Sequence, residues 1–259
     1  MATFGGDQEA PTVFITGATS GIGKATAEIF AKHGYGLVLC GRRQDRLNAL
    51  KTELGSGTKV HVLNFDVRDK VAVQSAIASL PQAFSNISIL VNNAGNAHGM
   101  DTIQEGSVDD WDAMIDINVK GLLYVSKAIL PKMIANKEGH IINIGSTAGK
   151  EVYPKGNVYC ASKHAVDALN QGMRMDLNQH GIRVGAVNPG LVETEFSNVR
   201  FKGDEERAKT VYKGYQPLKP EDIGDIIYFV VTRPYHVNIA DLVVMPTAQA
   251  SSTQINKNL

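Results

Sequence analysis

Cysteine is scarce in this sequence: only Cys40 and Cys160 occur among its 259 residues. Two distant cysteines supply neither a disulfide framework nor a Cys-x-x-Cys metal or redox motif. We therefore expect a protein of the reducing cytoplasm. The seven histidines show no H-E-x-x-H or similar ligand spacing, so the sequence predicts no metal site.

The chain also lacks net charge and long apolar runs. Lys plus Arg and Asp plus Glu both total 26, so the formal net charge is zero and no broad field would gather a polyanion. No segment approaches the roughly 18 apolar residues of a membrane helix, and the first residues lack the basic and apolar regions of a signal peptide. We expect neither nucleic-acid binding nor a membrane span.

Short β-branched runs alternate with longer helical patterns from Pro11 onward, which is typical of an α/β fold with a parallel sheet. Strands are predicted over residues 12–16, 36–40, 59–63, 87–91, 140–144, 183–187 and 241–245. Helices are predicted between them, over residues 22–33, 44–54, 71–80, 108–135, 159–180 and 221–232. No repeat or linker divides the chain, so we expect a flexible tail over residues 1–10 and a single domain over residues 11–259.

A long segment before the last predicted strand, residues 191–219, carries only one predicted helix, over residues 204–213. Long excursions from compact α/β domains are usually lids or binding segments, and such folds bind ligands at the carboxyl edge of the sheet. We interpret the segment as a substrate loop. A loosely packed surface loop is the alternative.

A glycine-rich turn, T-G-A-T-S-G-I-G, follows the first predicted strand. Its glycines allow close approach of a pyrophosphate, and the N-terminus of the next helix offers free N–H groups to phosphate. A strand before and a helix after are the context that such a motif requires, so the turn predicts dinucleotide binding. The predicted contacts here are Gly17, Thr19, Ser20, Gly21 and Ile22.

The second predicted strand ends in C-G-R-R, with two cations where NAD enzymes usually carry an acid. Arg42 and Arg43 suit the 2′-phosphate of NADP, and Ser20 could donate its hydroxyl to the same phosphate. We therefore expect NADP rather than NAD as the cofactor. The alternative is that both arginines only begin a solvated helix.

Small or polar residues also follow the third and fourth predicted strands. Asp66 could accept from the adenine amino group, with Val67 beside it, and Asn93, Ala94 and Gly95 lie where the chain would pass the cofactor ribose. Each turn is ordinary by itself. Their placement at successive strand ends favours one shared ligand.

A serine and a Tyr-x-x-x-Lys pair follow the fifth predicted strand. Tyr159 and Lys163 lie on one face of a predicted helix, so the ammonium can lower the pKa of the phenol from about 10. The tyrosine could then exchange a proton with an alcohol whose oxygen is hydrogen-bonded by Ser146. A second such pair, Tyr215 with Lys219, contains a proline that disfavours a helix, and we take it as a chance match.

Together, T-G-A-T-S-G-I-G, N-N-A-G, Ser146, Y-C-A-S-K and N-P-G resemble the short-chain dehydrogenase/reductase family over about residues 12–245. The resemblance implies a Rossmann-like doubly wound domain with helices on both faces, usually assembled as a homotetramer. It implies that Asn118 helps to hold a water beside Lys163, that Lys163 hydrogen-bonds the nicotinamide ribose, and that Thr194 binds the carboxamide. The remaining implied cofactor contacts are Pro189, Gly190 and Val192.

The segment P-G-L-V-E-T-E-F-S-N-V-R-F-K-G-D-E-E-R-A-K-T-V-Y and the tail V-N-I-A-D-L-V-V-M-P-T-A-Q-A-S are similar to the NADP-dependent serine/3-hydroxy acid dehydrogenase branch. That resemblance implies oxidation of the β-hydroxyl of L-serine, L-allo-threonine or a related 3-hydroxy acid. A guanidinium suits the substrate carboxylate, and Arg200 lies in the predicted substrate loop. The alternative is that Arg200 and Lys202 are solvated charges.

Two other functions remain open. A broad NADPH-dependent carbonyl reductase would use the same catalytic residues, with Ser146 and Tyr159 at the substrate. A dinucleotide-sensing regulator on this fold is the non-enzymatic alternative, and the complete set of Asn118, Ser146, Tyr159 and Lys163 disfavours it.

Overall fold

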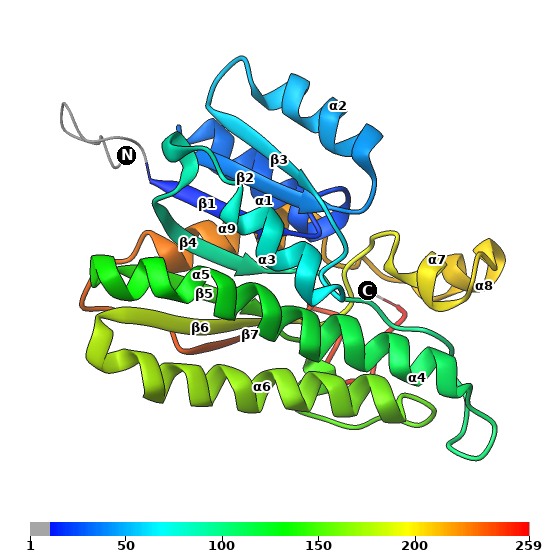
Figure 1. Cartoon of the computed structure of the whole chain (residues 1–259). Helices are drawn as coiled ribbons and strands as arrows, with labels where there is room; N and C mark the ends of the chain where they lie inside the picture. Colours follow the sequence, from blue (N-terminus) through cyan, green and yellow to red (C-terminus); the bar gives the residue numbers. More distant parts are fainter. Residues whose placement is uncertain (1–10, 259) are drawn as a thin grey trace.

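One sheet of seven parallel strands runs through the protein, in the order β3-β2-β1-β4-β5-β6-β7 (Figure 1). The computed structural model describes residues 11–258, so the expected flexible tail over residues 1–10 lies outside the described residues. The strands are β1 (Thr12–Thr16), β2 (Gly36–Gly41), β3 (Val60–Asn64), β4 (Ile87–Asn92), β5 (Gly139–Ile144), β6 (Ile182–Pro189) and β7 (Asp241–Val244). Each predicted strand is confirmed within two residues at its ends.

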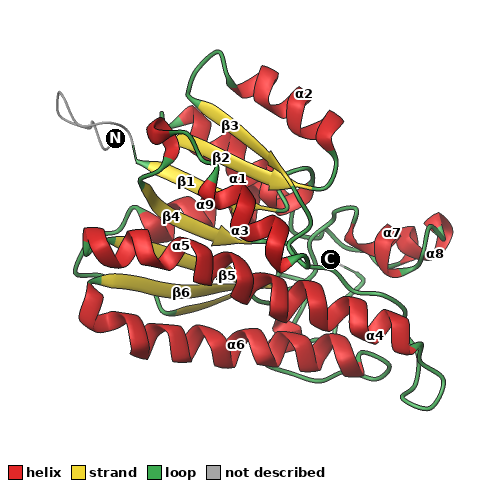
Figure 2. Cartoon of the chain, in the orientation of Figure 1, coloured by secondary structure: helices red, strands yellow, loops and turns green. Residues whose placement is uncertain are grey.

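Helices cover both faces of the sheet (Figure 2). The helices that pack on one face are α1 (Gly21–Lys32), α2 (Gln44–Leu54) and α9 (Pro220–Val231). Those that pack on the other are α3 (Lys70–Ala78), α5 (Leu122–Asn136) and α6 (Asn157–Leu177). The predicted α/β, doubly wound, single-domain architecture is therefore confirmed.

Alternating side chains of the strands divide the core into two clusters. Val13 and Ile15 of β1 pack under α1 and α9, whereas Phe14 between them packs with the residues of α3 and α5. Because neighbouring side chains of a strand point to opposite faces, one buried strand supplies both clusters. This explains why β1 is apolar or β-branched along its whole length.

The long helix predicted over residues 108–135 is interrupted by a π turn. It consists of α4 (Val108–Ile115), the π turn η2 (Asp116–Gly121) and α5. A π turn widens a helix by one residue and turns a side chain out of its regular position, and such turns occur frequently at functional sites. Asn118 lies inside η2.

The predicted substrate loop differs from expectation in its helices. It contains two of them, α7 (Phe196–Arg200) and α8 (Glu205–Thr210), where one over residues 204–213 was predicted. Lys202 and Gly203 have φ values of +54° and +91°, which end the first helix, and the Asp204 carboxylate caps the second by accepting from the Arg207 N–H. The five residues of α7 are too few to show a helical period in the sequence.

The order of the strands places the ligand-binding edge of the sheet. The chain leaves β3 at one edge and returns beside β1 through β4, so the direction of winding reverses between β1 and β4. The loops after these strands diverge at their carboxyl ends, and α7 and α8 lie beyond the same ends (Figure 1). Within residues 11–258, no helix is long and apolar enough to cross a membrane.

Candidate active site

A cavity of about 800 Å³ lies at the carboxyl ends of the strands. Its walls come from the segments that follow β1 through β7. The predicted site residues that line it are Gly17, Thr19, Ser20, Gly21, Ile22, Arg42, Arg43, Asp66, Val67, Asn93, Ala94, Gly95, Ser146, Tyr159, Lys163, Pro189, Gly190, Val192, Thr194 and Arg200. The structure therefore brings together every predicted site residue except Asn118, which is buried behind the cavity wall.

The glycine turn is held from behind by the segment after β4. Gly17 has φ +67°, and a Cβ there would lie 2.9 Å from the Asn93 amide nitrogen. That nitrogen donates to the Thr16 carbonyl oxygen at 2.8 Å. Ser20 is the N-cap residue of α1, but its hydroxyl makes no capping hydrogen bond. The turn thus presents backbone and the first N–H groups of α1 to the cavity, as a phosphate requires.

Arg43 is bound to the glycine turn. Its Nε and Nη2 donate to Thr19 Oγ1 at 3.1 and 2.8 Å, and Nη2 also donates to Ser20 Oγ at 2.8 Å. Its Nη1 donates to Glu195 Oε2 at 2.8 Å. These contacts do not fit the alternative that Arg43 only begins a solvated helix.

Arg42 is the more exposed of the two arginines, and its guanidinium lies 3.8 Å from a carboxylate oxygen of Asp66. Burial raises the pKa of Asp66, but hydrogen bonds from Arg68 and the charges of Arg68 and Arg42 outweigh it, so the pKa is lowered. Asp66 therefore stays an acceptor, as contact with an adenine amino group requires. That contact remains a prediction.

Tyr159 and Lys163 project from the first turns of α6 into the cavity, and both side chains are buried. Burial raises the pKa of the Tyr159 phenol well above its usual range, and the hydrogen bond with Ser146 and the charge of Arg200 offset this only in part. The lowering expected from Lys163 remains a prediction, because the net pKa shift in the protein chain by itself is upward. Desolvation of the phenol is the larger effect.

Lys163 is also shifted by burial, which lowers the pKa of its ammonium to about 8. Its Nζ donates to the Ile144 carbonyl oxygen at 2.9 Å, at the end of β5. This bond aligns the lysine along the cavity wall. Ser146, two residues further on, accepts a hydrogen bond from the Ala148 N–H, which fixes its oxygen at the start of the next turn.

Asn118 joins the π turn to the segment after β4. Its Oδ1 accepts from the Asn96 N–H at 2.9 Å, and its Nδ2 donates to the Asn96 carbonyl at 2.8 Å and to Ser162 Oγ at 3.0 Å. Gly95 lies close to both Asn118 and Lys163, since a Cβ there would lie 2.9 Å from Asn118 Oδ1 and 3.6 Å from Lys163 Nζ. The water-holding role of Asn118 remains a prediction.

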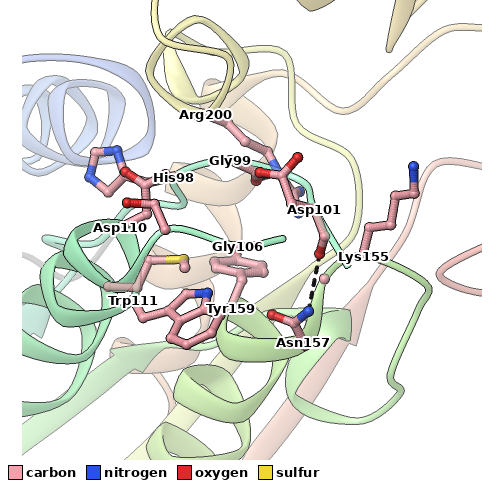
Figure 3. A pocket seen from close by; sticks show the side chains of 13 residues that line it. His98, Gly99, Asp101, Gly106, Asp110, Trp111, Lys155, Asn157, Tyr159 and Arg200 are labelled. Atoms are coloured by element: carbon pink, nitrogen blue, oxygen red, sulfur yellow. Dashed lines mark hydrogen bonds between the residues drawn. The ribbon is translucent and has the colours of Figure 1, made fainter. Parts of the chain in front are cut away.

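Arg200 lies over the ring of Tyr159. Its guanidinium carbon is 5.4 Å from the centroids of both the Tyr153 and Tyr159 rings, and Nη2 donates to the Tyr153 hydroxyl at 2.8 Å. Its Nε donates to the Gly99 carbonyl at 3.3 Å. A second pocket, of about 10 Å³, adjoins the same side chain and Tyr159 (Figure 3). Lys202 instead pairs with Asp110 at 2.9 Å.

The other Tyr-x-x-x-Lys pair lies outside this arrangement. The Tyr215 hydroxyl donates to the Val211 carbonyl at 3.0 Å, and Lys219 is the N-cap residue of α9. The residues between them are not helical, as the proline predicted. Neither residue belongs to the described set that lines the cavity.

The cavity is also lined by residues that no sequence motif indicated, and three of these are polar residues that matter for the site: Tyr153, Glu195 and Gln249. Tyr153 contacts Arg200, and Gln249 Oε1 accepts from the Leu191 N–H at 2.9 Å. All three come from irregular segments without periodicity or a motif. Only the proximity of Glu195 to the implied cofactor contact Thr194 offered a signal.

This combination of a doubly wound sheet, a glycine turn and a Ser-Tyr-Lys set defines a class of dehydrogenases. The pattern that describes the short chain dehydrogenase family matches residues 11–205, and the chain belongs to that family. It is 47% identical over 239 residues to the NADP-dependent 3-hydroxy acid dehydrogenase YdfG of Escherichia coli, which covers 92% of this chain and 96% of the relative.

Two further relatives point the same way. Sulfoacetaldehyde reductase 2 of Chromohalobacter salexigens is 46% identical over 241 residues, covering 93% of this chain and 96% of that one. The closed form of serine dehydrogenase complexed with NADP+ has a TM-score of 0.90 at 47% identity, covering 93% of this chain and 97% of that one. The expected family and fold are thereby confirmed.

Proposed function

We propose that this short-chain dehydrogenase reversibly oxidises the β-hydroxyl of small 3-hydroxy acids, such as L-serine or L-allo-threonine, with NADP+ as the hydride acceptor. The observation that carries the proposal is the position of the Arg200 guanidinium, 5.4 Å from the ring of the proton-exchanging Tyr159. A substrate whose hydroxyl reaches Tyr159 then has its acid group beside a cation. The names of the E. coli and NADP+-bound relatives support the same chemistry.

The residues present fit NADP. The glycine turn has backbone where a Cβ would collide, and Arg43 is held over Thr19 and Ser20, where an adenosine 2′-phosphate would lie. The cavity, at about 800 Å³, is at the upper end of the range of ligand sites. Bound NADP+ supplies the hydride acceptor and a cationic ring beside the phenol.

The protein's own residues move the proton. Ser146 would hydrogen-bond the substrate hydroxyl oxygen, and Tyr159 would take its proton as the phenolate while the C–H hydride leaves, so that a carbonyl forms. The charges of Arg200, Lys163 and the cationic ring of bound NADP+ would stabilise that phenolate against the effect of burial. Lys163 keeps a positive charge near the phenol below about pH 8. In the direction of reduction, Tyr159 returns the proton to the carbonyl oxygen, and its raised pKa keeps that proton available.

Arg200 has donors left for a substrate anion. Its Nη2 and Nε are used by Tyr153 and Gly99, whereas Nη1 makes no hydrogen bond with any residue in 11–258. A guanidinium edge in this position can bind a carboxylate. The sulfoacetaldehyde of the C. salexigens relative's name also carries an acid group, here a sulfonate.

Replacing Arg200 tests the substrate class. Arg200→Met should raise the KM for L-serine by about ten- to hundredfold, because a hydrogen-bonded charge is lost. The KM of a neutral ketone should change little. Steady-state kinetics on a panel of 3-hydroxy acids, sulfoacetaldehyde and neutral ketones measures both.

Arg207→Met in α8, where the side chain is exposed, is the matched control. Equal effects of Arg200→Met on acids and neutral ketones would contradict the role of Arg200. Preference of the unmodified protein for neutral ketones would favour a broad carbonyl reductase. NADPH binding without turnover of any panel member would favour the regulator.

The cofactor preference has its own test. Arg42→Ala with Arg43→Ala should raise the Kd of NADPH by about ten- to hundredfold, because charge-assisted bonds to the 2′-phosphate are lost. The Kd of NADH should change by less than about threefold. Titration of nucleotide fluorescence measures both constants, and an unchanged NADPH Kd would contradict the assignment.

We also propose a homotetramer in the cytoplasm. The family resemblance supports the assembly, and the scarcity of cysteine supports the compartment. Sedimentation velocity of the purified protein should give a single species of four chains. A monomer at micromolar concentration would contradict the assembly.

A further inference from the structure

We propose that Glu195 is a positioning residue that fastens the start of the substrate loop to the arginine of the 2′-phosphate site. The inference rests on the proposed function, in that it takes the cavity beside Arg43 as the NADP site. It assigns to Glu195 the task of holding the start of α7, with Phe196, against Tyr159.

Arg43 is a fixed anchor for this contact. Three hydrogen bonds from Nε and Nη2 tie it to Thr19 and Ser20 of the glycine turn, so its orientation does not depend on Glu195. Nη1 points to the substrate loop and donates to Glu195 Oε2 at 2.8 Å. The contact therefore holds the start of α7 to Arg43, rather than Arg43 to the loop.

A second arginine completes the fastening. Arg46, on α2, donates from Nη1 to the other carboxylate oxygen, Glu195 Oε1, at 2.6 Å. Each carboxylate oxygen thus has its own guanidinium. The hydrogen bond of Arg43, then that of Arg46 and both charges, lower the pKa of Glu195, with burial opposing them, so the carboxylate stays ionised at neutral pH.

The other end of α7 is fastened independently. The Gly99 N–H donates to the Arg200 carbonyl at 2.9 Å, and Lys202 pairs with Asp110 at 2.9 Å. Between the two ends, the Phe196 ring centroid lies 5.6 Å from that of Tyr159. Release of the Glu195 end would let Phe196 tilt away from Tyr159, while the Arg200 end of α7 and the glycine turn keep their own contacts.

This arrangement predicts that loss of the Glu195 carboxylate affects substrate binding but not cofactor binding. Loss of the carboxylate should lower the affinity for the substrate, since Phe196, which packs against Tyr159, is positioned through the start of α7. It should not lower the affinity for NADPH, because Arg43 keeps its hydrogen bonds to the glycine turn. If the Glu195 carboxylate only oriented Arg43, its loss would instead lower the affinity for NADPH and leave the affinity for the substrate unchanged.

The solvent exposure of the ion pair limits the expected change in KM. The side chains of Glu195 and Arg46 are each 43% exposed, so water competes with their ion pair. We expect Glu195→Gln and Arg46→Gln each to raise the KM of the 3-hydroxy acid about fivefold, with kcat and the NADPH Kd within about twofold. Arg46 is absent from the described residues that line the cavity, so its replacement leaves the nucleotide contacts in place.

Three measurements on the full chain test the proposal: KM against kcat, the NADPH Kd by fluorescence titration, and hydrogen exchange of α7 with NADPH bound. The double variant Glu195→Gln/Arg46→Gln should be no worse than Glu195→Gln, because both residues belong to one contact. Amides of α7 should exchange faster in all three variants. Glu193→Gln is the matched control, since that exposed carboxylate makes no hydrogen bond or ion pair with another described residue.

The outcomes separate this inference from the proposed function. Unchanged exchange and KM in Glu195→Gln, fully additive effects in the double variant, or a tenfold weaker NADPH affinity would each overturn the positioning role. Absence of turnover of every 3-hydroxy acid by the unmodified protein would overturn the proposed function instead. The exchange experiment with NADPH would still decide the role of Glu195.

Discussion

Burial moves the two titrating residues of the active site toward their neutral forms. The Tyr159 phenol is raised in pKa, and the Lys163 ammonium is lowered to about 8. The lysine donates to a backbone carbonyl at the end of β5, and the guanidinium carbon of Arg200 lies 5.4 Å from the centroid of the Tyr159 ring. Arg200 is therefore both the proposed substrate anchor and a positive charge beside Tyr159.

Removal of the Tyr159 hydroxyl is the sharpest single-residue test. Tyr159→Phe should lower kcat by about a hundred- to ten-thousandfold, because general acid–base catalysis is lost. The NADPH Kd should be unchanged. Tyr215→Phe, which alters the other Tyr-x-x-x-Lys pair, is the control and should keep its activity. Loss of activity in both variants, or in neither, would contradict the assignment.

The ends of a helix can be predicted from local chemistry where the sequence contains a capping residue or a helical period. The Asp69 carboxylate accepts from the N–H groups of Val71 and Ala72 at 2.9 and 3.0 Å, so it caps α3. Ser107 occupies the same position before α4, but its hydroxyl makes no capping hydrogen bond. The two N-termini thus form a natural comparison.

Asp69→Ala should lower the free energy of unfolding by about 1 kcal/mol, as expected for loss of a side-chain cap. Ser107→Ala should change it by less than about 0.5 kcal/mol. Urea denaturation at one fixed protein concentration measures both. Equal destabilisation by the two substitutions would show that the observed cap does not stabilise α3.

At the scale of the whole molecule, neutrality conceals a local excess of positive charge. The chain has no net charge, yet the charged residues lining the cavity are Arg42, Arg43, Lys163, Arg200 and Lys257 against Asp66 and Glu195. A pocket with more cations than carboxylates suits a ligand that carries phosphates and an acid group. The absence of a broad positive field is compatible with this local one.

The stability of the whole protein should depend on one histidine away from the site. His140, in β5, is 2% exposed, and neither ring nitrogen has a hydrogen-bond partner among the described residues. Burial, with the charge of the neighbouring Arg183, lowers its pKa to about 3. The unfolded chain takes up this proton near pH 6.5, so stability falls as the pH drops from 6.5 toward 3.

Between pH 7 and pH 5 this residue should cost about 2 kcal/mol of unfolding free energy. His140→Leu should remove that part of the pH dependence, whatever its effect on stability at pH 7. Chemical denaturation of both proteins at a series of pH values measures the slopes. An equal pH dependence of the unfolding free energy in the two proteins would contradict the lowered pKa of His140.

Local patterns determined much of this protein. Several features depend only on neighbours within a few residues, and they lie where the sequence predicted. They are the periods of the strands and helices, the glycine turn, the Tyr159–Lys163 spacing and the two arginines. The π turn and α7 did not follow from the sequence, because a widened turn and a five-residue helix leave no period to detect.

Tertiary structure alone decided which distant residues meet. Arg43 and Glu195 are 152 positions apart, and Arg200 reaches Tyr153 and Gly99 from a segment with no motif of its own. Such pairs depend on the order in which the strands assemble and on how the loop after β6 folds back over the sheet. The sequence by itself specified a dehydrogenase and its glycine turn. The packing of the loop after β6 set the surroundings of Tyr159, because burial and long-range pairing arise only when the chain folds.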